Sequence, residues 1–236
     1  MASKDSEMSK NIQSKSTPNS EHLLNVLKAG LATAPFCGGL ASLITDYIPS
    51  GKSKRLEEFA QKISEDLERL QDQVREEVLH TDDFAFMFEQ SFRGVAENYQ
   101  PEKIDAFRGI LVNSAIGFNA PAAEREYFLN LANSLSPLHL RILKFTAMPD
   151  RYLAEMQISS DWIRGGFSTF FPIAIPGVNI EVIKSAFGEL HQYGFLNTDK
   201  SIFSTITSGQ GLELLGHGGR VTALGKKFIH FCTAPQ

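Results

Sequence analysis

The sequence is poor in residues that could staple the fold covalently, because its 236 residues include only two cysteines, Cys37 and Cys232. The two lie far apart, and the N-terminus lacks the basic and then apolar order of a secretory signal. We therefore expect both thiols to be free in a reducing cytoplasm. A chain of this length can bury a sizeable core, so its stability needs no disulfide.

An excess of charge of one sign is also missing. The net charge is −4, with 14 basic and 20 acidic residues in positions 1–135 and 9 basic and 7 acidic residues in positions 136–236. Nucleic-acid-binding domains usually concentrate positive charge on one face or in one segment. Neither half therefore has the composition of a strong nucleic-acid binder.

Familiar catalytic and metal-binding patterns are absent from the sequence. None of the six histidines lies three or four residues from another, and His230 and Cys232 would point to different sides of a helix. Gly51-Lys52-Ser53 lacks the leading glycine of a phosphate loop, because Asp46 stands in its place. No serine has the neighbours of a nucleophile elbow. We therefore expect no enzyme activity, no cofactor and no metal ion.

The first 48 residues have two parts of opposite character. Residues 1–20 contain one large aliphatic residue, Ile12, and predict a disordered tail. Residues 23–48 are apolar with a central Pro and Gly pair, and fall just short of the roughly 20 apolar residues of a membrane helix. We favour a buried helical hairpin and keep membrane insertion or self-association as the alternative, with four candidate contact residues: Leu31, Phe36, Leu40 and Leu43.

Apolar residues at helical spacing predict a bundle over residues 21–135. One stripe predicts a single amphipathic helix over 52–79, with Leu56, Phe59, Ile63, Leu67, Leu70, Val74 and Val78 on one side. Further helices are expected over 84–99, from Pro101 to the breaker at 117–121, and over 122–135. Their short connections should place each helix against its sequence neighbours.

Residues 136–236 predict a winged-helix-like module, which makes the whole chain mainly α. Ser136-Pro137 begins one helix, a short helix is expected near 161–167, and Asn179 caps a helix that Gly194 ends. We expect strands at 195–198 and 220–221 to form a small β-hairpin, followed by a last helix from Thr222. Helices followed by a hairpin and a further helix are the order of a winged helix.

A winged helix raises the question of DNA binding, for which Lys184, Lys226 and Lys227 are the candidate contacts. The helix at 179–193 also carries Glu181 and Glu189, which would repel phosphates. We therefore favour a protein-contacting role and keep a DNA-binding regulator as the alternative.

Two segments carry a resemblance to a known family. Residues 124–129 read Glu-Arg-Glu-Tyr-Phe-Leu, and residues 134–143 read Ser-Leu-Ser-Pro-Leu-His-Leu-Arg-Ile-Leu. Within residues 80–230, the chain resembles bacterial proteins grouped as abortive-infection alpha-like. That family has no established catalytic residues, and the resemblance implies a role in phage defence or on mobile elements. The leading hypothesis is a non-enzymatic component that binds a protein partner, either a second copy or another chain. The other alternative is a membrane-active effector that uses residues 23–48.

Overall fold

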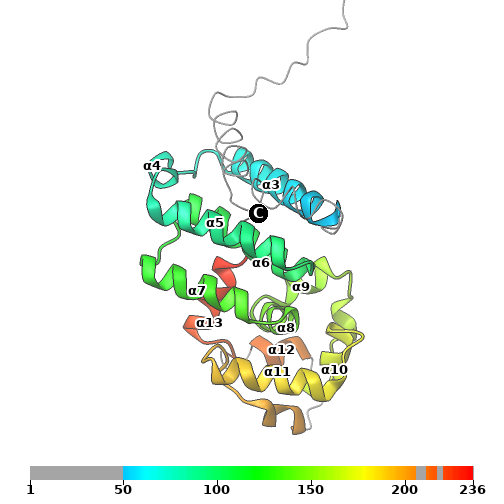
Figure 1. Cartoon of the computed structure of the whole chain (residues 1–236). Helices are drawn as coiled ribbons and strands as arrows, with labels where there is room; N and C mark the ends of the chain where they lie inside the picture. The colour runs from blue at the N-terminus through cyan, green and yellow to red at the C-terminus, as the bar shows by residue number, and fades with distance from the viewer. Residues whose placement is uncertain (1–49, 206–210, 217–219, 236) are drawn as a thin grey trace, which may run out of the picture. The chain divides into compact units, whose positions relative to one another are not determined.

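The computed structural model describes residues 50–205, 211–216 and 220–235, and this part of the chain is mainly helical (Figure 1). Residues 48–236 belong to one compact unit. The predicted tail and the apolar segment, with Leu31, Phe36, Leu40 and Leu43, lie outside the described residues.

The predicted 28-residue helix is shorter than expected. Helix α3 spans Ser50–Arg69, and α4 spans Glu76–Leu79 after a turn. Neither Gly nor Pro occurs between them, so the break has a tertiary cause. The Leu70 side chain is buried and the Arg75 amide donates to the Ala115 carbonyl at 3.2 Å, which redirects the chain onto helix α6 (Pro101–Ala115). Periodicity could not reveal this bend, because Val74 and Val78 continue the apolar stripe.

Three predicted helices follow nearly as expected, with α5 at Asp82–Glu97, α6 at Pro101–Ala115 and α7 at Ala122–Ser134. The Thr81 hydroxyl accepts from the Phe84 amide at 3.2 Å and caps α5. Pro101 occupies the first turn of α6, where its missing N–H costs nothing. Helices α5 and α6 pack on α3, whose side chains Phe59, Ile63 and Leu67 are buried, and α7 packs on α5 and α6.

The second half is also helical. Its longer helices are α8 (Pro137–Ala147), α10 (Phe167–Ala174), α11 (Ile180–Gln192) and α13 (Ala223–Phe231), and its shorter elements are α9 (Pro149–Glu155), η1 (Ser160–Trp162), η2 (Lys200–Ser204) and α12 (Gly211–Gly216). Asn179 caps α11, as predicted, and Thr222, where the last helix was expected to begin, caps α13. The short helix expected at 161–167 is only the 3-10 turn η1, which ends at Trp162, and Gly165, with φ +78, separates it from α10.

The predicted β-hairpin is not supported, because the described residues contain no β-strand. A single antiparallel bridge joins Leu196 to Val221. Beside it, the Asn197 amide donates to the Arg220 carbonyl at 2.8 Å and the Thr222 amide donates to the Phe195 carbonyl at 3.0 Å. The pairing then stops, because the Asp199 carboxylate accepts from the Ser201 amide at 2.8 Å and starts η2. A capping side chain thus directs residues 200–204 into a 3-10 helix where sequence reasoning expected a wing.

The predicted termination of α11 is confirmed. Gly194 has φ +75, its amide donates to the His191 carbonyl at 2.9 Å, and the Phe195 amide donates to the Leu190 carbonyl at 3.0 Å. These two bonds form a Schellman motif, in which glycine adopts the left-handed conformation at little cost.

Replacing Gly194 with Val should cost about 1–2 kcal/mol, because a β-branched residue is strained at positive φ. A Cβ atom at Gly194 would meet nothing within 4 Å, so the cost should be conformational and not a clash. Thermal unfolding and hydrogen exchange of residues 195–198 measure the effect. The control is Gly51→Val, where a Cβ also meets nothing within 4 Å and φ is not positive. An unchanged melting temperature in Gly194→Val would contradict the prediction.

The aromatic core continues across the expected boundary between residues 135 and 136. Phe128 of α7 packs edge-on against Phe228 of α13, with ring centroids 5.6 Å apart. Phe118, after α6, lies 4.8 Å from Phe231 of α13. Helix α6 also contacts α8. The two predicted modules therefore share part of one core.

Candidate functional site

The three lysines proposed for DNA contact are not gathered on one helix. Lys184 lies on α11 and its ammonium is 2.7 Å from a Glu181 carboxylate oxygen. Lys227 lies on α13, 2.7 Å from a carboxylate oxygen of Glu124, and Lys226 is exposed on the same helix. Two of the three positive charges are thus balanced by carboxylates, which weakens any attraction to phosphates.

A chain of polar side chains that sequence reasoning missed joins α8 to α11. The Ser136 hydroxyl lies 2.7 Å from His139 Nδ1, and His139 Nε2 lies 3.0 Å from a Glu189 carboxylate oxygen. The Ser136 amide also donates to Nδ1 at 3.2 Å, so Nδ1 is an acceptor and Nε2 carries the proton that Glu189 accepts.

This order of serine, histidine and carboxylate is that of a nucleophile with its general base, but the same contacts cap a helix. The Ser136 hydroxyl accepts from the His139 amide at 3.4 Å, which completes a capping box at the start of α8. His139 occupies the position where such boxes usually have Glu or Gln, so the usual sequence pattern of a capping box does not reveal this one. The cluster fixes α8 against α11.

A buried lysine of α6, Lys103, reaches the C-terminal end of α7. Lys103 is 3% exposed, and its ammonium donates to the carbonyl of Ala132 and to those of Asn133 at 2.7 Å and Leu135 at 2.6 Å. A cation at a helix C-terminus is favoured by the helix dipole. Burial lowers the pKa of Lys103 to about 8, while Cys232 acts in the opposite direction. Burial raises the pKa of the Cys232 thiol far above its ordinary value, against the influence of Lys103.

Lys103 and Cys232 should make stability depend on pH with opposite signs. Folded Lys103 loses its proton near pH 8 and unfolded lysine near 10.5, so raising the pH between these values favours the folded state. The unfolded thiol ionises near pH 9.0 while folded Cys232 stays protonated, so its effect, when the pH rises above about 9, is to favour the unfolded state. The Cys232→Ala variant keeps only the lysine effect and the Lys103→Met variant keeps only the thiol effect. We therefore expect the urea midpoint to rise more with pH in Cys232→Ala than in Lys103→Met. Equal pH slopes in the two variants would contradict this prediction.

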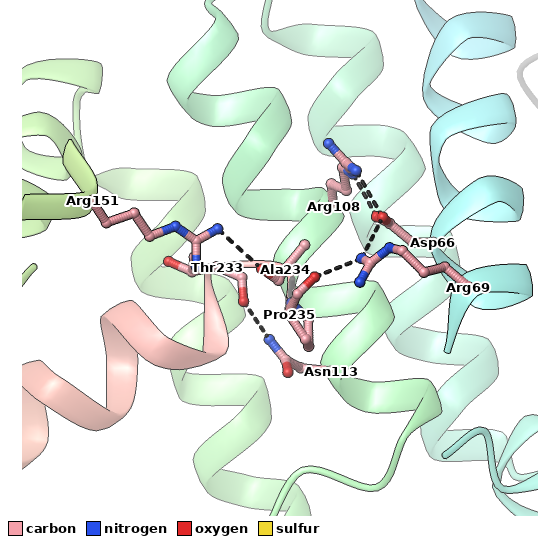
Figure 2. Close-up of polar contacts among 8 residues, drawn as sticks. All are labelled: Asp66, Arg69, Arg108, Asn113, Arg151, Thr233, Ala234 and Pro235. Atoms are coloured by element: carbon pink, nitrogen blue, oxygen red, sulfur yellow. Dashed lines mark hydrogen bonds and ion pairs between the residues drawn. The ribbon is translucent and has the colours of Figure 1, made fainter. Parts of the chain in front are cut away.

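The C-terminal strap, defined as Thr233–Pro235, is held by side chains from three different helices (Figure 2). The Asn113 amide donates to the Thr233 carbonyl at 3.0 Å, Arg151 donates to Ala234 at 3.3 Å, and Arg69 donates to Pro235 at 2.6 Å. Asn113 also reaches the carbonyls of His230 and Phe231, so it caps the end of α13. The strap thereby connects α6, α9 and α3.

A buried carboxylate lies beside the strap. Asp66 of α3 is 2% exposed and accepts two hydrogen bonds from Arg108 of α6, at 2.6 and 2.8 Å. Arg69 donates to the same carboxylate at 3.0 Å (Figure 2). The hydrogen bond to Asp66 and the negative charge of Asp66 both raise the pKa of Arg108. The two-pronged geometry fixes both the position and the rotation of α3 on α6.

An exposed tryptophan lies in a firmly anchored segment. The Trp162 side chain is 64% exposed in η1, next to the buried Ile163, whose carbonyl accepts from the Gly211 amide at 2.8 Å. Gln157 has φ +55, which is unusual for a residue with a side chain and is a form of strain that often marks functional segments. Exposed apolar side chains are common, but a tryptophan presented on fixed backbone is typical of protein-binding surfaces.

Comparisons with known proteins identify no relative of this chain. No family model, no curated protein and no solved structure matches the chain. Within the described ranges, no group of three or more His, Cys, Asp or Glu side chains could hold a metal ion. In the same residues, no helix is both long enough and apolar enough to cross a bilayer.

Proposed function

We propose that this chain is a non-enzymatic protein-interaction component of a bacterial phage-defence system of the abortive-infection type, and that it acts in the cytoplasm. The observation that carries the interaction role is Trp162, an aromatic side chain displayed on anchored backbone. Large aromatic residues supply much of the binding energy of protein interfaces. The phage-defence setting comes from the sequence resemblance.

The polar clusters support a role without catalysis. Ser136 and His139 cap α8, Lys103 caps α7, and Asn113 caps α13, so each of these groups is engaged in holding helices. A nucleophile and its base must be free to meet a substrate, whereas Ser136 and His139 are both engaged in the capping box at the start of α8. DNA binding is the weaker alternative, because the winged-helix comparison now rests on helix order alone and two of its candidate lysines face carboxylates.

The test is phage protection in cells that express the chain. We expect Trp162→Ala to reduce the protection at least about tenfold, because truncating an aromatic hot spot typically removes about 2 kcal/mol of binding free energy. Tyr99→Ala is the matched control, since Tyr99 is 73% exposed on a different part of the chain. Its protection should equal that of the unaltered chain.

Two results would overturn the proposal. One is the absence of protection by the unaltered chain, which would remove the phage-defence setting. The other is hydrolase activity that Ser136→Ala or His139→Ala abolishes while circular dichroism shows both variants folded, which would replace the interaction role with an enzymatic one.

A further inference from the structure

We propose that the C-terminal strap, Thr233–Pro235, is a latch for helix α3, so that withdrawing Ala234 and Pro235 loosens the C-terminal turns of α3 while the remaining helices stay folded. This inference is independent of the role of Trp162. It rests on the way the strap is held and on its route across α6.

The strap is anchored unequally along its length. At its start, a Cβ atom on Gly109 of α6 would lie 2.3 Å from the carbonyl carbon of Cys232, so the two backbones are in close contact. Asn113, which is 1% exposed, holds Thr233 there. Beyond Thr233, the bonds are single contacts from Arg151 and Arg69, whose side chains are 29% and 42% exposed. The strap is therefore fixed at its root and weakly held at its tip.

The tip is the part that reaches α3. The Pro235 carbonyl accepts from Arg69, in the last turn of α3, and Arg69 also pairs with Asp66 (Figure 2). Without the tip, α3 keeps its Asp66–Arg108 pair and its buried apolar side, but its last turn loses an anchor on the neighbouring helices. Loss of a charged hydrogen bond of this kind should shift the local opening equilibrium about 5- to 30-fold and leave global unfolding much less affected.

Such a latch gives the strap a regulatory use. All three strap bonds are made by backbone carbonyls, and no strap side chain is needed for them. A partner that paired with the backbone of residues 234–235 would compete with Arg151 and Arg69 and would release the end of α3. In the sequence, α3 directly follows the apolar residues 23–48, so the latch acts on the helix that leads from that segment into the bundle.

The experiment is hydrogen exchange with mass spectrometry on the full chain and on three variants. One variant ends after Thr233, and the second is Arg69→Ala, which keeps the strap but removes its bond to α3 together with the Arg69–Asp66 pair. The control is Lys54→Ala, an exposed residue of α3 whose ion pair among the described residues is with Glu58. We expect exchange in residues 63–70 to accelerate about 5- to 30-fold in the first two variants. Residues 180–192 of α11 and the whole Lys54→Ala variant should keep the exchange of the full chain.

The outcomes separate a latch from simple stabilisation. If residues 63–70 exchange at the same rate in the truncated chain and in the full chain, the strap does not hold α3 and the proposal is wrong. If α11 accelerates as much as α3, the strap contributes to global stability and is not a latch. Should the truncated chain fail to fold, Arg69→Ala tests the loss of the Pro235 bond together with the Asp66 pair, and unchanged exchange in residues 63–70 of that variant would overturn the proposal.

Discussion

Replacing Phe128 with Ala should cost about 3–5 kcal/mol of unfolding free energy, the usual cost of removing a buried phenyl ring. Phe128 is fully buried, and its ring packs on Phe228 and Phe231 of α13 at centroid distances of 5.6 and 6.0 Å. The substitution therefore removes packing that joins residues before position 135 to the end of the chain.

The same variant tests whether residues on both sides of position 135 unfold together. Trp162, the only tryptophan, reports on the second half by fluorescence, while circular dichroism reports on all helices. In urea, both signals should show one shared transition, displaced to lower denaturant in Phe128→Ala. The control is Tyr127→Ala, whose 47% exposed side chain should cost much less. Two separate transitions would instead favour independent modules at 21–135 and 136–236.

Replacing Gly109 with Ala should destabilise the protein by about 3 kcal/mol, because added atoms in a packed site force backbone shifts. The new Cβ would lie 2.3 Å from the carbonyl carbon and oxygen of Cys232 and 2.5 Å from the Thr233 nitrogen. These are backbone atoms, so the clash cannot be relieved by rotating a side chain. The root of the strap would have to move off α6.

Gly188→Ala is the matched control, since Gly188 lies in the interior of α11 as Gly109 lies in α6. Its Cβ would meet the Lys200 side chain, whose nearest atom is Cδ at an ordinary 3.5 Å. Alanine favours a helix over glycine by about 1 kcal/mol, so this variant should be slightly more stable than the unaltered chain. Urea unfolding measures both. If the two alanine variants had the same stability, close backbone contact at Gly109 would not be the reason for its glycine.

Local signals predicted much of the helical fold. Thr81, Ser136, Asn179 and Thr222 each cap the helix that follows them, and Gly194 ends α11 with positive φ. These features depend on residues within one helical turn, so they can be read directly from the sequence. The length of α3 was predicted wrongly, because its apolar stripe continues past the point where packing on α6 turns the chain.

The candidate functional groups were much less predictable. Asp66 and Arg108 are 42 positions apart and Arg69 and Pro235 are 166 apart, so no spacing rule links them. The β-hairpin was expected from β-branched and glycine-rich composition, yet the described part of residues 195–221 forms only the Leu196–Val221 bridge. Strand pairing depends on partners that are distant in sequence, while the Asp199 cap that competes with it acts within two residues.

The sequence by itself determined where most helices begin and end, because caps, prolines and apolar periodicity act over a few residues. Tertiary structure decided which of those helices share a core and what their polar groups do. Lys103, Asn113 and Asp66 look like ordinary helix residues in the sequence, and each is buried in the fold. Their roles as cap or ion-pair partner exist only because distant carbonyl groups or guanidinium groups come within hydrogen-bonding distance, where a buried polar group must find a partner.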